Sequence, residues 1–149
     1  MKRKPVLPPT FFWTAAVLSA ILHFVLPVIS IISFPVTLVG LVPIAFGAVL
    51  NIWADQLFTK KSTTVKPFDT PTALIIEGPF AWFRHPMYLG MVAILLGLSL
   101  ICGSLSSLVG PIGFWLVVRF RFVWTEEQSM TEVFGEEYEN YRSKVHSWL

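Results

Sequence analysis

Charged residues are scarce in this sequence. Only 13% of its 149 residues are Asp, Glu, Lys or Arg, whereas ordinary soluble domains contain roughly a quarter. Two long intervals, Pro5 to Ala54 and His85 to Val118, contain no formal charge. Hydrophobic residues make up 54% of the chain, and the mean hydropathy is +0.67. This composition excludes a soluble globular domain and an intrinsically disordered chain.

Cysteine is almost absent as well. Cys102 is the single cysteine and lies within an apolar run, which excludes an internal disulfide framework. The net charge of +2 is small and scattered, which argues against a nucleic-acid partner. No group of Cys, His, Asp and Glu has the spacing of metal ligands, and no Ser–His–Asp arrangement is recognisable. The sequence therefore predicts neither a metal site nor nucleic-acid binding.

The two uncharged intervals are long enough to hold transmembrane helices, each of which needs about 20 mostly apolar residues. We therefore predict an all-α integral membrane bundle of about four transmembrane helices, forming a single domain over residues 1–149. Spans are expected near residues 11–32, 36–57, 88–102 and 107–123, the last two being short. A loop is expected at 58–87, and an amphipathic helical tail, interrupted at Gly135, at 124–149.

All charges fall on one side of this predicted bundle. Lys2, Arg3 and Lys4 precede the first interval, whereas the expected hairpin tips near Ser33 and Ser104 carry no charge. Cationic loops stay in the cytosol, so both termini are expected there. The membrane would be the cytoplasmic membrane of a prokaryote or the endoplasmic reticulum of a eukaryote. A signal peptide is the alternative for the N-terminus, but no small-x-small cleavage site ends the apolar stretch.

A first polar cluster precedes the third expected span. Gly78-Pro79 is a turn signal, and Pro86 suits the first turn of a helix. Arg84 and His85 are therefore expected at the cytosolic mouth of that span, where the backbone N–H groups of the helix start also point. Such a place can receive a carboxylate or a phosphate. The alternative is an interfacial belt whose aromatic and arginine side chains only anchor at lipid headgroups.

A second cluster follows the fourth expected span and contains Arg119, Arg121, Glu126 and Glu127. Thr125 is a plausible N-cap of a new helix that has both glutamates in its first turn. If the span continues unbroken instead, Arg119 and Glu126 are expected to face the same cavity. Arginine near membrane depth is a functional candidate, and the alternative is that both arginines anchor the chain at the interface.

These motifs together resemble the isoprenylcysteine carboxyl methyltransferase family, which is related to the phospholipid N-methyltransferases. The resemblance covers residues 64–149. Thr64-Val-Lys-Pro67 and Leu74 fit the loop that precedes the first family motif. The motifs are Gly78-Pro-Phe-Ala-Trp-Phe-Arg-His-Pro-Met-Tyr-Leu-Gly90, then Glu126-Glu127, then Phe134-Gly-Glu-Glu-Tyr138 and Tyr141.

The resemblance implies a membrane enzyme that uses S-adenosyl-L-methionine and methylates a lipophilic or lipid-anchored acceptor. It implies that an arginine shortly before the paired glutamates contacts the acceptor, so Arg121 is the expected catalytic residue and Arg119 the competing choice. An amine or thiol acceptor would have to be deprotonated, and Glu127 and Tyr88 are the candidate bases. The expected cofactor contacts are Thr72, Ala73, Leu74, Ile75, Phe80, His85, Pro86, Met87, Tyr88 and Glu126.

Several functions are compatible with these residues. Carboxyl methylation of an isoprenylcysteine-type acceptor is the first expectation, and a phospholipid amine or a small lipophilic acid stays open as the acceptor. A non-catalytic membrane protein that keeps the fold is a second class. A nicotinamide-dependent sterol-type reductase, whose C-terminal spans are similar, is a third. The short chain and the paired glutamates argue against the reductase.

Overall fold

The computed structural model describes residues 6–26, 29–64 and 69–147. Lys2, Arg3, Lys4 and residues 65–67, which the sequence analysis used, lie outside this part of the chain. The described residues form helices and turns, and their only strand-like pairing is an isolated bridge between Ser30 and Ser104. The predicted all-α fold is confirmed.

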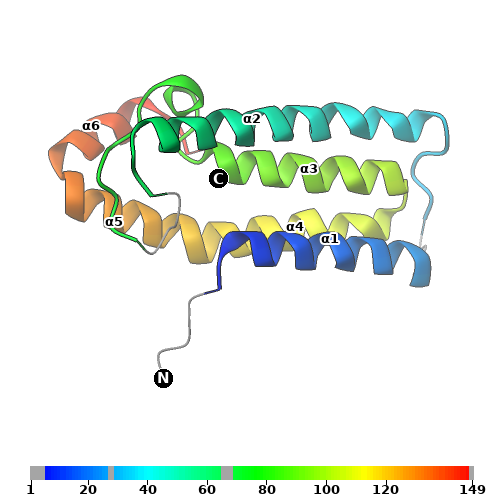
Figure 1. The fold of residues 1–149 in the computed structure, drawn as a ribbon. Helices are drawn as coiled ribbons and strands as arrows, with labels where there is room; N and C mark the ends of the chain where they lie inside the picture. Colours follow the sequence, from blue (N-terminus) through cyan, green and yellow to red (C-terminus); the bar gives the residue numbers. More distant parts are fainter. Residues whose placement is uncertain (1–5, 27–28, 65–68, 148–149) are drawn as a thin grey trace.

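Four helical segments run side by side along the length of the molecule (Figure 1). The first three are α1 (Pro8–Val25), α2 (Leu41–Lys60) and α3 (Pro86–Cys102); a 3-10 turn, Val36–Gly40, leads into α2. The fourth segment consists of a 3-10 turn (Leu105–Leu108), α4 (Val109–Val117), a π-helical stretch (Val118–Val123) and α5 (Trp124–Phe134). Helix α6 (Glu136–Lys144) follows, and a further 3-10 turn, Gly78–Ala81, lies between α2 and α3.

Three of these segments are long and apolar enough to cross a membrane, namely Pro8–Val25, Val36–Lys60 and Leu105–Phe134. Helix α3 is apolar but shorter. Large apolar side chains are exposed on α1 and α2, among them Trp13, Ile21, Phe24, Val42 and Phe46. Lipid tails solvate such side chains, whereas water does not. The chain is therefore a membrane protein.

Helix boundaries differ from the expected spans at two places. Helix α1 ends at Val25 rather than Ile32, because Pro27 disfavours helical backbone in the residue before it. The fourth segment is not short, since it continues to Phe134. Thr125 is consequently not an N-cap: its hydroxyl donates a 2.9 Å hydrogen bond to the carbonyl of Arg121 within one continuous helix. The expected break at Gly135 is confirmed.

The two hairpin tips are joined at one end of the bundle. The amide of Ile31 donates to the carbonyl of Gly103 at 2.8 Å, and Leu105 donates to Ile29 at 2.9 Å. Buried serines complete the junction, because Ser19 and Ser99 both donate to the carbonyl of Ser107 at 2.8 Å. Hydrogen-bonded serines remove the cost of placing polar groups in an apolar environment. This junction holds the two hairpins together.

Helices α2 and α3 approach each other closely along a glycine seam, defined as Gly40, Gly47, Gly90 and Gly97. A Cβ atom on Gly47 would clash with the carbonyl oxygen of Gly90, and one on Gly97 would clash with that of Gly40. Small residues let helices pack closely in lipid. The seam therefore fixes the position of α3, at whose N-terminal end His85 lies.

We expect Gly47→Ala to destabilise the protein by about 1–3 kcal/mol, because the added methyl group overpacks the seam against rigid backbone. The matched control is Gly113→Ala in α4, since outside the backbone of its own helix no heavy atom in the described part of the chain lies within 4 Å of the position that its Cβ would take. Thermal unfolding in detergent measures both variants. Equal midpoints for Gly47→Ala, Gly113→Ala and the parent would show that the seam is not tightly packed.

Candidate functional site

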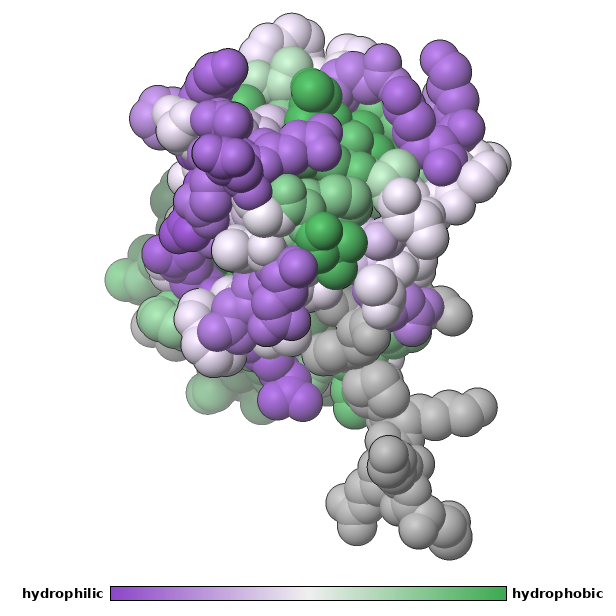
Figure 2. All heavy atoms as spheres, turned by 90° about the vertical axis from the view of Figure 1, so that its left-hand side faces the viewer, coloured by the Kyte–Doolittle hydropathy of each residue, from purple (hydrophilic) through white to green (hydrophobic). Residues whose placement is uncertain are grey.

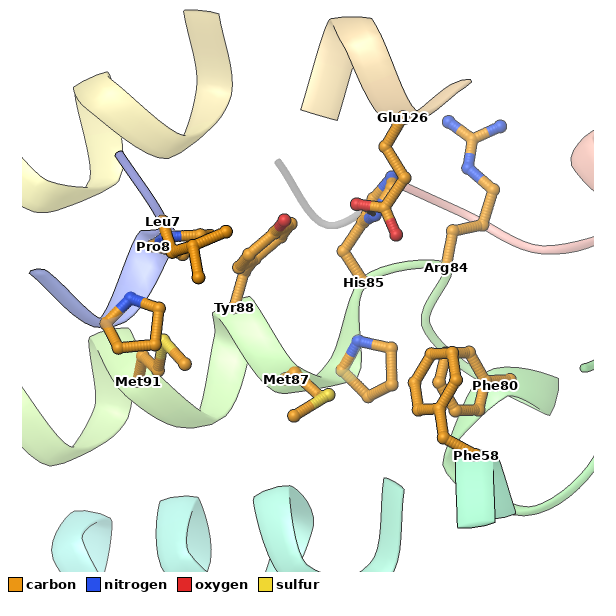
Figure 3. A pocket seen from close by; sticks show the side chains of 12 residues that line it. Leu7, Pro8, Phe58, Phe80, Arg84, His85, Met87, Tyr88, Met91 and Glu126 are labelled. Atoms are coloured by element: carbon orange, nitrogen blue, oxygen red, sulfur yellow. Dashed lines mark ion pairs between the residues drawn. The ribbon is translucent and has the colours of Figure 1, made fainter. Parts of the chain in front are cut away.

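Two adjoining cavities lie at the end of the bundle opposite the hairpin tips. Figure 1 shows that α3 begins and α5 passes at this end, and Figure 3 shows the first cavity from close by. Seen from this end, hydrophilic side chains surround a hydrophobic centre (Figure 2). The first cavity has a volume of about 150 Å³, and the second about 30 Å³. Both are lined by Phe58, Phe80, Arg84, His85 and Glu126.

The loop that carries the site is folded onto the end of α2. Gly78 has a φ of +61°, which suits glycine, and it starts the 3-10 turn that contains Phe80. The ring of Phe80 packs edge-on against Phe58, with centroids 5.5 Å apart, and Ala54 and Ile75 complete this small core. The turn therefore places Arg84 and His85 directly before the first residue of α3.

Four charged side chains, Arg84, His85, Glu126 and Glu127, form what we call the charge cluster. Arg84 Nη2 lies 3.0 Å from Glu127 Oε1, and His85 Nε2 lies 3.2 Å from the same oxygen. On the other side of the ring, His85 Nδ1 lies 3.5 Å from Glu126 Oε2. The side chains of Arg84 and His85 are only 10% and 4% exposed. Burial at this level requires that each charge have a partner.

The position of His85 between two carboxylates favours its charged form. A neutral imidazole has one N–H, whereas both ring nitrogens of His85 face a glutamate. Burial alone would lower the pKa of His85, but the hydrogen bonds and charges of Glu126 and Glu127 outweigh it, and the pKa rises above its ordinary value of 6.5. The ring of Tyr88 stacks on the imidazole, with the two ring centroids 5.9 Å apart. The cluster is therefore a paired set of cations and anions.

Two buried atoms of this cluster have unused hydrogen-bonding capacity. Within the described part of the chain, Arg84 Nε makes no hydrogen bond, and Glu126 Oε2 has only its 3.5 Å ion pair with His85 Nδ1. One is a donor and the other an acceptor, and both residues line both cavities. Buried polar atoms normally make hydrogen bonds. Buried atoms of a native protein that lack them therefore point to a ligand or to water. A carboxylate and an ammonium group, as in an α-amino acid, fit Arg84 and Glu126 respectively.

The structure brings together nearly all of the residues expected to contact a cofactor. Thr72 is the exception: it lines neither cavity, and its hydroxyl donates to the carbonyl of Ser62 at 3.3 Å. That these residues contact a cofactor stays a prediction. Those that line one or both cavities are Ala73, Leu74, Ile75, Phe80, His85, Pro86, Met87, Tyr88 and Glu126.

The two arginines of the fourth segment are placed differently. Arg119 and Arg121 are exposed and line neither of the two cavities, because Val118, Phe122 and Val123 occupy the buried face of the π-helical stretch. The expectation that Arg119 shares a cavity with Glu126 is therefore wrong. A π-helical turn contains an additional residue, and this changes which side chains face the bundle.

Several lining residues were not predicted from the sequence. Tyr138 and Tyr141 line the second cavity from α6. Their spacing of three residues in the sequence indicates that they share one face of a helix. Leu7 and Pro8 line the first cavity from the start of α1, for which no motif gave a signal. Glu127, considered above as a candidate base, joins Arg84 to His85, which the sequence did not predict.

The raised pKa of His85 predicts how stability depends on pH. The folded state favours the imidazolium, so its stabilising contribution is complete below pH 6.5 and is lost as the pH rises through the higher folded-state pKa. We expect the thermal midpoint in detergent to fall over that range. His85→Gln should remove this fall of the thermal midpoint with rising pH. The same fall in the variant and the parent would show that another group is responsible.

Comparison with known proteins gives matches over most of the chain. The family model for phospholipid methyltransferases matches residues 35–137. The protein-S-isoprenylcysteine O-methyltransferase of Homo sapiens is 32% identical over 148 residues, which is 92% of this chain and 50% of the human protein. The enzyme of the same name from Xenopus laevis is 31% identical over 118 residues, covering 76% of this chain and 40% of that protein.

A third relative, the protein-S-isoprenylcysteine O-methyltransferase of Schizosaccharomyces pombe, is 36% identical over 77 residues, covering 51% of this chain and 32% of that protein. The chain thus spans about half the length, or less, of these three relatives. The resemblance to the isoprenylcysteine carboxyl methyltransferases is confirmed. Because the family match covers more than half of its residues, this chain belongs to the phospholipid methyltransferase family.

Proposed function

We propose that this chain is an S-adenosyl-L-methionine-dependent methyltransferase that methylates the carboxyl group of a lipophilic, isoprenylcysteine-type acceptor. The observation that carries this proposal is the charge cluster beside an apolar cavity, in which Arg84 Nε is buried without a hydrogen bond and Glu126 Oε2 has only its 3.5 Å ion pair with His85. The relatives named above support the reaction class, since they are protein-S-isoprenylcysteine O-methyltransferases.

The residues of the two cavities fit the chemistry of this donor. S-adenosyl-L-methionine supplies a methyl group on a sulfonium centre and also has an α-amino acid group and an adenine ring. Arg84 would hold the carboxylate, together with the N-terminus of α3, and Glu126 would hold the ammonium. Leu74, Phe58 and Phe80 supply apolar surface for the adenine ring.

The charge cluster would contribute to catalysis by positioning. Methyl transfer is an in-line displacement, so the protein has to align two reactants and stabilise the charge distribution of the transition state. Arg84 holds Glu127, which holds one nitrogen of His85. This chain of contacts keeps the carboxylates in fixed positions before any ligand binds. Preorganised charges of this kind need no reorganisation at the moment of reaction.

The acceptor side of the site is apolar. Leu7, Pro8 and Met91 line the first cavity beside Met87 and Tyr88. Helix α3 has 17 residues, which at 1.5 Å each span about 26 Å. The hydrocarbon core is about 30 Å thick, so the site would lie near a membrane surface. A carboxylate presented at that depth needs no general base.

We propose that this membrane surface is the cytosolic one and that both termini lie there, since charged residues gather at this end.

Methyl transfer in reconstituted membranes tests the reaction. The purified protein in lipid nanodiscs is incubated with tritiated S-adenosyl-L-methionine and either an S-prenylated cysteine or phosphatidylethanolamine. We expect label on the prenylcysteine that alkali releases as methanol, because esters hydrolyse and N-methyl groups do not. Alkali-stable label on phosphatidylethanolamine would favour the phospholipid N-methyltransferase function instead. Absence of label on both would contradict the proposal.

We further propose that Arg121 contacts the acceptor. Its guanidinium is exposed and, among the residues that the structure describes, makes no ion pair, so it is available to a carboxylate arriving from the lipid. Lysine cannot reproduce the paired hydrogen bonds of arginine. Arg121→Lys is therefore expected to lower kcat/KM for the acceptor by about 10- to 150-fold.

The control for Arg121→Lys is Arg119→Lys, because Arg119 is also exposed and lies on the same π-helical stretch. Donor affinity, measured by titration with S-adenosylhomocysteine, should be unchanged in both variants. A larger loss of kcat/KM at Arg119 would reverse the assignment. Equal small losses would show that both arginines only anchor the chain at the membrane surface.

A further inference from the structure

Helix α6 forms one wall of the second cavity. Its two buried side chains, Tyr138 and Tyr141, are 3% and 9% exposed and both line that cavity. The other residues of α6 are exposed. The opposite wall comes from Ala73, Leu74 and Ile75 of the loop after α2. Helix α6 therefore covers part of the proposed donor site and is held there by few buried side chains.

The second cavity is too small for the ligand that its residues suit. Its volume is about 30 Å³, and a single water molecule needs roughly 10–15 Å³ on this scale. Two or so water molecules fill it, whereas a nucleoside is many times larger. Since the lining residues come from α6 on one side and from the loop on the other, one of these two walls has to move outward before an adenosine group enters.

Gly135 is suited to act as the hinge for such a movement. It joins α5 to α6 with φ +51° and ψ −121°, a conformation that L residues with a side chain rarely adopt. Apart from the neighbouring residues in the chain, no heavy atom of the residues that the structure describes lies within 4 Å of the position of a Cβ there, so the backbone conformation and not the available space requires glycine. One side-chain hydrogen bond, from Thr131 to Glu139 at 3.2 Å, spans the hinge.

The contacts that hold α6 closed go to residues of the site. The Tyr141 hydroxyl donates a buried 2.7 Å hydrogen bond to the carbonyl of Phe80. Longer contacts join the guanidinium of Arg84 to the carbonyl of Arg142 at 3.5 Å, and Arg142 to Glu127 at 3.9 Å. Burial raises the pKa of Tyr141, so its hydroxyl stays protonated and remains a donor. Tyr141 makes the shortest of these contacts.

We propose that α6 is a lid over the donor cavity, hinged at Gly135 and latched by the hydrogen bond from Tyr141 to Phe80. This inference rests on the proposed function, because it assumes that the methyl donor binds in the cavity that α6 covers. Opening would admit the donor and release the demethylated product. Closing would return Tyr138 and Tyr141 to the cavity wall and exclude water from the charge cluster.

Tyr141→Phe tests the latch, because it removes the hydroxyl and keeps the ring. We expect tritiated S-adenosylhomocysteine to dissociate about 2- to 12-fold faster from this variant in nanodiscs, the change that one neutral hydrogen bond supports. Tyr138→Phe is the control, since the Tyr138 hydroxyl makes no hydrogen bond to any described residue. Equal dissociation rates for the two variants and the parent would overturn the latch.

Hydrogen exchange without ligand tests the lid independently of the proposed function. In the intact protein, the amides of α6 should exchange faster in Tyr141→Phe than in the parent or Tyr138→Phe, while those of α3 stay unchanged. Unchanged exchange in α6 would overturn the lid. If S-adenosylhomocysteine fails to bind the parent while α6 exchange still increases in Tyr141→Phe, the lid stands and the proposed function fails.

Discussion

The ion pairs around His85 are the constraint on which the rest of the site depends. His85 lies between two carboxylates, and Arg84 holds one of these at 3.0 Å. Breaking a buried pair by removing one partner leaves an uncompensated charge, which costs about 3–5 kcal/mol. The loop that carries Arg84 and the helix that carries Glu126 and Glu127 are therefore held together by electrostatics at the same end of the bundle.

The bundle supplies the fixed positions that these charges need. The glycine seam sets the start of α3 relative to α2, because backbone atoms are in contact at Gly47 and Gly90. Phe122, buried in the π-helical stretch, packs against Phe11 of α1 and Tyr88 of α3. This packing orients the following turn so that both glutamates face His85. Apolar packing in the membrane thus determines the geometry of a polar site at its surface.

Much of this arrangement could be predicted from the sequence. Charge-free intervals indicated the helices, and the turn at Gly78 with Pro86 located Arg84 and His85 at the start of α3. The orientation of the arginines could not be predicted, because a helical wheel for Arg119 assumes a regular helix and the π-helical stretch departs from it. The contribution of Leu7 and Pro8 to the cavity depends on how α1 packs against α3, which is a tertiary contact without a local signal.

Titration of S-adenosylhomocysteine into the protein in lipid nanodiscs tests the central claim, that the charge cluster is a donor site. We expect calorimetric binding at one site per chain. We expect Glu126→Gln to weaken binding by about 10- to 150-fold at a temperature where the variant is still folded, since one charge-assisted hydrogen bond to the donor is lost. Absence of binding to the parent, or equal affinity in Glu126→Gln, would contradict the account.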